Sequence, residues 1–247
     1  MQAVLDDVVD VSYGGLGPVL RFRSEGKPVR IVLSMARGLA QNLVTQARLT
    51  SVDRLKGVSW ALDGFGALSH HMARRLVRAL GIEGSDIDWQ AVGPPPERSG
   101  RLLADTNDVS PIRVEEAIAL TTDDSNSLHT LLGFAELKEL VPLQPHGVLA
   151  MKEAYEQSQG EEVTHLARGV IRSSRALHDD FKNFRKVHDH HVSISAPDPA
   201  IRTIWKQEPH TNGFAVNGEL THNHWQNQMT LFYKPTPGFP ASRGPTS

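Results

Sequence analysis

Histidines are concentrated in one short stretch of the sequence, FKNFRKVHDHHV at residues 181–192. It holds His188, His190 and His191, three of the 12 histidines of the chain. An imidazole can ligate a metal ion or haem iron, and it can move a proton near neutral pH. A core histidine that only satisfies its own hydrogen bonds is the structural alternative. The stretch therefore raises the question of which histidine points inward, and toward what.

A helix over residues 147–195 would place some of these side chains on one face. Mostly apolar side chains recur there at steps of four and three, which is the spacing of a single helix face. The stripe consists of Val163, Ala167, Val170, Ser174, Leu177, Phe181, Phe184, His188, His191 and Ser195. We expect His188 to continue the buried stripe behind Phe184, with His191 on the same face and His190 turned away.

The composition excludes several classes of protein. The chain has 247 residues, of which 39% are hydrophobic and 22% charged, as is typical of a globular protein. Its net charge of −2 indicates no nucleic-acid partner and no membrane-surface partner. No apolar run approaches the roughly 20 residues of a membrane span, and the N-terminus shows no secretion signal, so we expect a cytoplasmic location. Without cysteine, a transition metal would rest on His, Asp, Glu, Tyr or Met.

The sequence pattern predicts that the elements holding these residues are mainly helical. Alternating β-rich runs and turns predict a small antiparallel element near the N-terminus, and helical patterns follow over residues 34–49 and 51–80. Three consecutive prolines indicate a loop over residues 82–110, after which Ser110 and Pro111 would begin a helix. The long helix over 147–195 would bend near Gly160.

These patterns predict a mainly α fold in a single domain, residues 1–247. Its parts are a β-rich N-terminal element at 1–34, a helical core at 35–195 and an irregular C-terminal segment at 196–247.

Residues 184–192, FRKVHDHHV, have the form F-R-x-x-H-x-x-x-V. This run resembles the proximal haem helix of the tryptophan 2,3-dioxygenase superfamily, which also includes haem-dependent tyrosine hydroxylases. The resemblance implies a helical bundle around a haem pocket. It also implies that His188 ligates the iron of haem b as the metal ligand, with Phe184 and Arg185 beside the cofactor.

The resemblance further implies a distal histidine on an early helix, a place that His70 or His71 fills as a catalytic group. The family's Gly/Thr-rich loop corresponds to residues 210–218, HTNGFAVNG, which implies that Thr211 and Gly213 contact the substrate. A zwitterionic substrate would need a cation for its carboxylate, and Arg74 is a candidate. The altered loop and the missing H-Q-x-Y-E-L-W-F signature favour the tyrosine hydroxylase branch.

The resulting hypothesis is a haem-dependent oxygenase or peroxygenase of a biosynthetic pathway. It would use oxygen or hydrogen peroxide to hydroxylate the ring of L-tyrosine, with tryptophan oxidation second, and a homo-oligomer is left open. Two alternatives remain: a non-haem metalloenzyme built on His188, His191 and either His222 or His224, and a non-catalytic helical binding protein with structural histidines.

Overall fold

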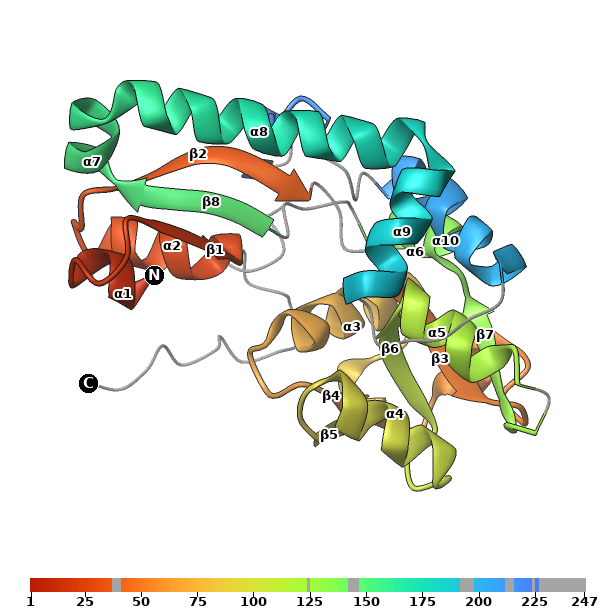
Figure 1. The fold of residues 1–247 in the computed structure, drawn as a ribbon. Coiled ribbons are helices and arrows are strands. Elements are labelled where there is room, and N and C mark those ends of the chain that lie inside the picture. Colours follow the sequence, from red (N-terminus) through yellow and green to blue (C-terminus); the bar gives the residue numbers. More distant parts are fainter. Residues whose placement is uncertain are drawn as a thin grey trace. The chain divides into compact units, whose positions relative to one another are not determined.

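Helices and strands alternate along most of the chain, in a computed structural model whose elements are labelled in Figure 1. The structure describes residues 1–36, 41–123, 125–141, 147–191, 198–211, 216–223 and 225–226, without the side chains of residues 36 and 207–211. The chain divides into two units. Unit 1 takes residues 1–39, 143–193 and 197–226, and unit 2 takes residues 40–142, 194–196 and 227–247. Because two such units occur within single domains as well as in pairs of domains, the predicted single domain stays a prediction.

Unit 1 contains a three-stranded antiparallel sheet in the order β1-β8-β2. Its strands are β1 (Val11–Gly14), β2 (Val29–Ala36) and β8 (Gly147–Lys152). β1 and β2 both pair with β8, which comes much later in the chain. The sheet therefore depends on a contact between segments far apart in sequence.

Helices cover the sheet of unit 1, and Figure 1 shows the longest of them, α8, running alongside β2. Leu16, Val19 and Phe22, at helical spacing on α2, pack against Val148 and Ala150 of β8. Among the described helices, none combines the length and the apolar character needed to cross a membrane. The helices of unit 1 are α1 (Gln2–Leu5), α2 (Leu16–Ser24), α7 (Glu153–Ser158), α8 (Gly160–Asp179), α9 (Phe181–His191) and α10 (Asp198–Thr211).

Unit 2 contains a five-stranded mixed sheet in the order β5-β4-β6-β3-β7. β4 runs parallel to β5 and β6, whereas β3 is antiparallel to β6 and β7. The strands are β3 (Gln41–Gln46), β4 (Ser59–Leu62), β5 (Asp88–Ala91), β6 (Val109–Arg113) and β7 (Leu128–Leu132).

Each parallel strand of unit 2 is followed by a helix. α3 (Leu68–Ala79) follows β4, α4 (Pro95–Leu103) follows β5, and α5 (Val114–Thr121) follows β6. The other helical elements are α6 (Phe134–Leu140) and the short 3₁₀ helices η1 (Val52–Leu55) and η2 (Gly84–Asp86). The core of the unit includes Val44, Leu102, Ile112, Ala117 and Leu128.

The predicted mainly α fold, a helical bundle around a haem pocket, is wrong, because the chain is an α/β protein with two sheets. Residues 34–49, expected to be helical, hold the end of β2 and all of β3. β3 is buried at every position, and a strand buried on both faces lacks the apolar–polar alternation that identifies strands in a sequence. The expected helix over 51–80 likewise contains β4, and its helical part is only α3.

Prolines misled the prediction twice. Pro111, expected in a first helical turn, lies inside β6, which pairs with β4 only through Val109. Beyond Val109, β6 pairs only with β3. A strand that is paired on one side tolerates proline, which has no N–H to donate. The expected loop over 82–110 contains β5 and α4, because the proline run that was read as a break fills the first turn of α4 at Pro95.

The two ends of the chain also differ from expectation. Strands do occur within residues 1–34, but residues 16–24 form α2, and the strands pair with β8 rather than with each other. The expected long helix over 147–195 begins as strand β8. Its predicted break near Gly160 is confirmed, and a second break follows Asp179. The segment expected to be irregular contains α10.

Candidate functional site

Unit 2 has an edge at which three parallel strands end. The carboxyl ends of β4, β5 and β6 lead into α3, α4 and α5. In open α/β sheets, ligands bind in the loops outside the carboxyl ends of parallel strands. We call residues 63–74, 92–98 and 113–116 the carboxyl edge.

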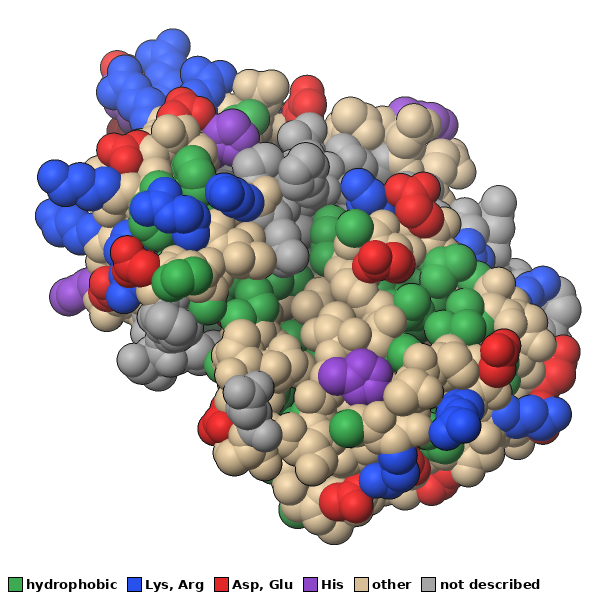
Figure 2. All heavy atoms as spheres, turned by 90° about the vertical axis from the view of Figure 1, so that its right-hand side faces the viewer, with side chains coloured by type: hydrophobic (Ala, Val, Ile, Leu, Met, Phe, Trp, Pro, Cys, Tyr) green, Lys and Arg blue, Asp and Glu red, His purple; other side chains and the backbone are tan. Residues whose placement is uncertain are grey.

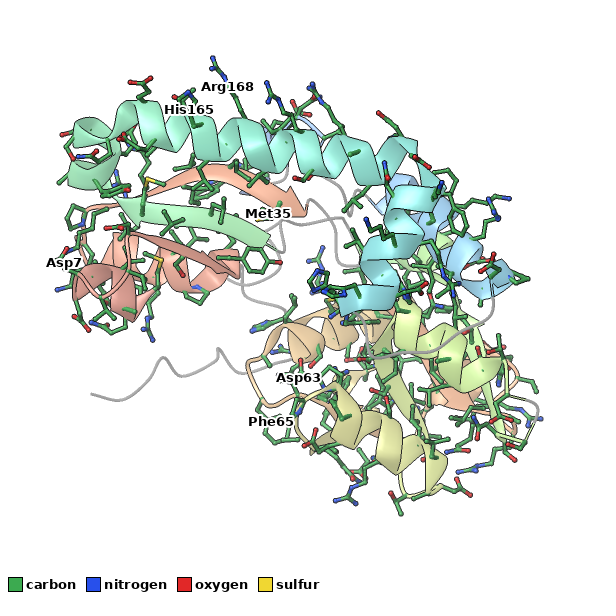
Figure 3. All side chains as sticks on the ribbon, in the orientation of Figure 1. Asp7, Met35, Asp63, Phe65, His165 and Arg168 are labelled. Carbon is green, nitrogen blue, oxygen red and sulfur yellow. The ribbon has the colours of Figure 1, made fainter. Side chains whose placement is uncertain are left out.

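The loop that joins β4 to α3, DGFGA, is tied to the first turn of the helix. The Asp63 N–H donates to the Oγ atom of buried Ser69 over 3.0 Å. Gly66 has a φ of +80°, a left-handed conformation that glycine adopts without strain, and its N–H donates to Nδ1 of His70 over 2.9 Å. Asp63 and Phe65 therefore project from a loop that is held at both ends (Figure 3).

Aromatic rings form a series from this loop to the core of unit 2. Phe65, 65% exposed, lies edge-to-face on His70 with ring centroids 5.5 Å apart. His70 lies edge-to-face on Trp89 at 5.8 Å, and Trp89 is tilted against the fully buried Trp60 at 5.6 Å. Such aromatic pairs contribute about 0.5–1.5 kcal/mol beyond area burial. The series holds the His70 imidazole between an exposed ring and the core.

His70 is neutral at physiological pH. Burial, together with the nearby charges of Arg74 and His71, lowers its pKa to about 4. A backbone N–H can only donate, so the bond from Gly66 makes Nδ1 the acceptor and places the proton of the neutral ring on Nε2. Burial and Arg74 also lower the pKa of His71, against the effect of a hydrogen bond with the Gly66 backbone.

A buried arginine connects the ends of β4 and β6. Arg98 of α4 is 1% exposed, and its Nη2 lies 2.9 Å from Oδ1 of Asp63. Its Nη1 donates to the carbonyl of Pro111 and lies 3.4 Å from Oγ of Ser110. Burial lowers the pKa of Arg98, whereas the carboxylates of Asp63 and Glu116 raise it. The guanidinium therefore holds the strand ends together.

Glu116, on the first turn of α5, is the second carboxylate near this arginine. Burial raises the pKa of Glu116, and the positive charges of Arg113 and Arg98 oppose that shift. Sequence analysis missed Arg98, Asp63 and Glu116. A signal for one of them exists in PERSGRLL, where Arg98 stands four residues before Leu102, on the face that α4 buries.

The predicted distal and substrate residues lie together at the carboxyl edge. His70, His71 and Arg74 are neighbours on α3, with the two imidazole centroids 6.0 Å apart. Their helix, α3, follows the loop at the end of β4 and packs in an α/β unit rather than in a helical bundle. Their catalytic and substrate roles stay predictions.

The predicted haem residues lie on α9 in unit 1. His188 is 4% exposed, and its ring centroid is 6.0 Å from that of Phe184. Its Nδ1 lies 3.5 Å from Oδ1 of Asp189, and its Nε2 makes no hydrogen bond in the described part of the chain. Arg185 is paired with Asp189 and Asp198, each over 2.8 Å. The inward position of His188 and the outward position of His190 are confirmed. His191, expected on the buried face, is exposed, since it is the last residue of α9.

The remaining predicted residues are described only in part. Thr211 is the last residue of α10, with its side chain outside the described ones, and Gly213 lies outside the described residues altogether. His224 also lies outside the described residues, whereas His222 is described and exposed. Across the described ranges, no group of three His, Cys, Asp or Glu residues is placed to hold a metal ion. The non-haem alternative on His188 and His191 therefore finds no geometric support there.

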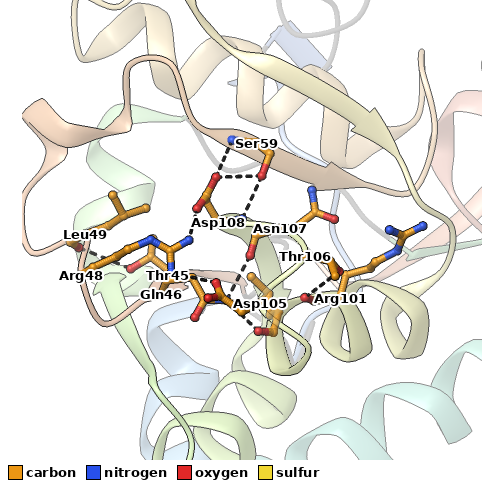
Figure 4. A network of polar contacts seen from close by, with 11 residues as sticks. Thr45, Gln46, Arg48, Leu49, Ser59, Arg101, Asp105, Thr106, Asn107 and Asp108 are labelled. Carbon is orange, nitrogen blue, oxygen red and sulfur yellow. Dashed lines mark hydrogen bonds and ion pairs between the residues drawn. The ribbon is translucent and has the colours of Figure 1, made fainter.

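A second polar network lies at the opposite edge of the same sheet (Figure 4). Arg48 bonds to Asp105 over 2.7 Å and to Asp108, and Asp108 accepts from the N–H of Ser59 over 2.9 Å and from its hydroxyl over 2.8 Å. A cavity of about 460 Å³ adjoins it, lined in part by Gln46 and Arg48. Because two carboxylates already bind the guanidinium, we interpret this network as structural.

Charges of both signs are interspersed on the molecular face shown in Figure 2. This mixture agrees with the net charge of −2. Long-range steering of a strongly charged polymer needs a continuous field of one sign, and that face does not present one.

Comparison with known proteins identifies the fold. No family model and no curated protein matches the sequence. The alkanesulfonate-binding protein SsuA of Xanthomonas axonopodis pv. citri, bound to MOPS, matches with a TM-score of 0.68 and 18% identity, over 93% of this chain and 75% of that one. The periplasmic aliphatic sulphonate binding protein SsuA of Escherichia coli matches with a TM-score of 0.66 and 15% identity, over 93% of this chain and 71% of that one. The zinc-bound ligand binding component of an ABC-type import system from Staphylococcus aureus matches with a TM-score of 0.63 and 14% identity, over 94% of this chain and 75% of that one. The chain therefore has the generic periplasmic-binding-protein fold.

This fold overturns the functional hypothesis drawn from F-R-x-x-H. The solved proteins that share it are binding proteins and a component of an importer. The resemblance to the tryptophan dioxygenase superfamily and the predicted oxygenase activity are therefore wrong. The expected cytoplasmic location is contradicted as well, because the E. coli protein that shares the fold is a periplasmic binding protein. Alkanesulfonate and sulphonate are small molecules, in agreement with the predicted small-molecule partner, whereas oxygen or peroxide as a partner finds no support.

Proposed function

We propose that the chain is a non-catalytic binding protein that holds a small organic molecule at the carboxyl edge of unit 2. We further propose that it works outside the cytoplasm and delivers this molecule to an ABC-type importer. The observation that carries the proposal is a held loop with a fixed, neutral histidine at the ligand-binding edge of the sheet. Support comes from the solved binding proteins that share the fold.

The chemistry of the edge suits binding better than catalysis. A general base works best with a pKa near the working pH, and His70, with a pKa of about 4, is a weak base at neutral pH. A neutral imidazole in one tautomer is instead a directional hydrogen-bond donor. The buried Arg98–Asp63 pair keeps the surrounding loops in place.

Isothermal titration calorimetry of the purified chain with small sulfonates and carboxylates tests this proposal. The panel includes propanesulfonate and MOPS, and the expected result is saturable binding with one site per chain. Asp63→Ala should weaken the binding, because it removes the carboxylate that ties the loop to Nη2 of Arg98. Leu103→Ala is the matched control, an exposed residue of α4 away from the edge. A panel with no saturable binder would contradict the proposal.

Haem b, held by His188, stays a prediction that the proposed function does not need. Its support is a buried imidazole whose Nε2 makes no hydrogen bond among the described residues. A haemin titration followed by absorption spectroscopy tests it. A histidine-type Soret band that His188→Ala abolishes would support ligation, and identical spectra of the two proteins would exclude it.

A further inference from the structure

The ring series at the carboxyl edge points to the chemical class of the ligand. We propose that the surface formed by Phe65 and His70 binds an aromatic ring that carries a hydrogen-bond acceptor. The acceptor, a carbonyl, carboxylate or sulfonate oxygen, takes the proton on Nε2 of His70. This inference rests on the proposed function and narrows its ligand.

Phe65 supplies the aromatic part of this surface. It is a large apolar side chain with 65% exposure, on a loop that Ser69 and His70 hold in place. Its ring is already ordered by an edge-to-face contact with His70 at 5.5 Å. A ring that is fixed before binding loses little conformational entropy when a second ring stacks on it. The exposed ring is therefore a prepared platform.

His70 supplies the polar part. Its Nδ1 is occupied by the Gly66 N–H, and the ring is fixed by edge-to-face contacts with Phe65 and Trp89. In the described part of the chain no protein group bonds to Nε2, and this nitrogen is not among the buried atoms without a partner. Because Nε2 is not fully buried, its N–H is accessible to an acceptor on the ligand.

Two guanidinium groups at the carboxyl edge are already held by other protein groups. The buried guanidinium of Arg98 already holds Asp63 over 2.9 Å and the carbonyl of Pro111. Arg113 is paired with Glu115 at 3.6 Å. Because Arg98 and Arg113 are engaged within the protein, the proposed ligand contacts are the exposed ring of Phe65 and the neutral N–H of His70.

The test compares two probes that differ only in the ring, benzenesulfonate and cyclohexanesulfonate. Binding is measured by calorimetry and by tryptophan emission, since Trp89 contacts His70 and should report an occupied surface. We expect benzenesulfonate to bind about tenfold more tightly, as one stacking contact implies. Phe65→Ala and Phe65→Leu should both remove this preference, because leucine keeps apolar area without a ring.

His70 variants test the donor separately. His70→Ala should weaken both probes, whereas His70→Gln, which keeps a neutral N–H, should restore part of the affinity. Leu103→Ala serves as the control and should change neither probe. Circular dichroism of each variant shows whether it has folded.

The outcomes separate the inference from the proposed function. Equal affinities for the two probes, or a preference that survives Phe65→Ala, would overturn the aromatic ligand and leave small-molecule binding intact. Failure of every small organic anion to bind would overturn both.

Discussion

Replacing Asp63 should destabilise unit 2 more than replacing Arg98. The two side chains form an ion pair at 2.9 Å in which Arg98 is buried and Asp63 is 36% exposed. Asp63→Asn leaves the buried guanidinium without the carboxylate that it contacts, and only the charge of Glu116 remains nearby. Arg98→Met instead leaves a carboxylate that water reaches, and it fills the space with an apolar side chain of similar length.

The magnitudes follow from this asymmetry. Removing one partner of a fully buried pair costs about 3–5 kcal/mol. The exposure of Asp63 reduces this to about 2 kcal/mol for Asp63→Asn, because water screens part of the interaction. Arg98→Met should cost about 1 kcal/mol, mainly the lost bond to the Pro111 carbonyl. In the double variant the loss should be close to that of Arg98→Met alone.

Urea unfolding at pH 7, followed by tryptophan fluorescence, measures these differences. Trp60 and Trp89 both lie in unit 2 and report its unfolding. An Asp63→Asn variant as stable as the wild type, or a larger loss for Arg98→Met, would refute the reasoning. Either result would mean that the buried guanidinium does not depend on Asp63.

Three further predictions concern the loop and the opposite edge of unit 2. His70 has a pKa of about 4 in the folded protein against 6.5 in the unfolded chain. The unfolded state therefore takes up a proton first, and stability should fall as the pH drops from about 6.5 to 4. In thermal melts the fall in melting temperature over this range should be smaller for His70→Gln, and equal falls would count against a neutral His70. Gly66→Ala and Gly57→Ala both force alanine to a positive φ, +80° and +77°, and should each cost about 1 kcal/mol in melts, but only Gly66→Ala should weaken ligand binding in calorimetry. Burial raises the pKa of the partly buried Asp108, but hydrogen bonds from Ser59 and Arg48 lower it by more. Asp108→Ala should therefore lose about 2 kcal/mol in urea unfolding at pH 7; an unchanged midpoint would argue against the network.

Local helical signals were readable where one face of a helix is buried. The stripe from Val163 to His188 describes the buried side of α8 and α9 correctly, since the apolar period is that of the helix. The break near Gly160 was readable too. His191 was misplaced because α9 ends there.

The sheets were not readable from the same signals. β8 joins β1 and β2 from a position far along the chain, and no local pattern shows such pairing. β3 was read as helix because both of its faces are buried. Without the strands, the functional hypothesis rested on a short match to F-R-x-x-H. A buried histidine on one face of a helix does not by itself indicate a cofactor or a reaction.

The carboxyl edge could be predicted only in part. His70, His71 and Arg74 were found because adjacent histidines and an arginine stand out in a helix. The pairing of Asp63 with Arg98 could not be predicted, because these residues are 35 positions apart and become neighbours only when the sheet of unit 2 has formed.

Calorimetric titration of the wild-type chain with benzenesulfonate tests the central claim most directly. The account predicts saturable binding with one site per chain, weakened in Phe65→Ala and unchanged in Leu103→Ala. Heats that show no saturation with benzenesulfonate, propanesulfonate or MOPS would contradict a small-molecule site at the carboxyl edge of unit 2.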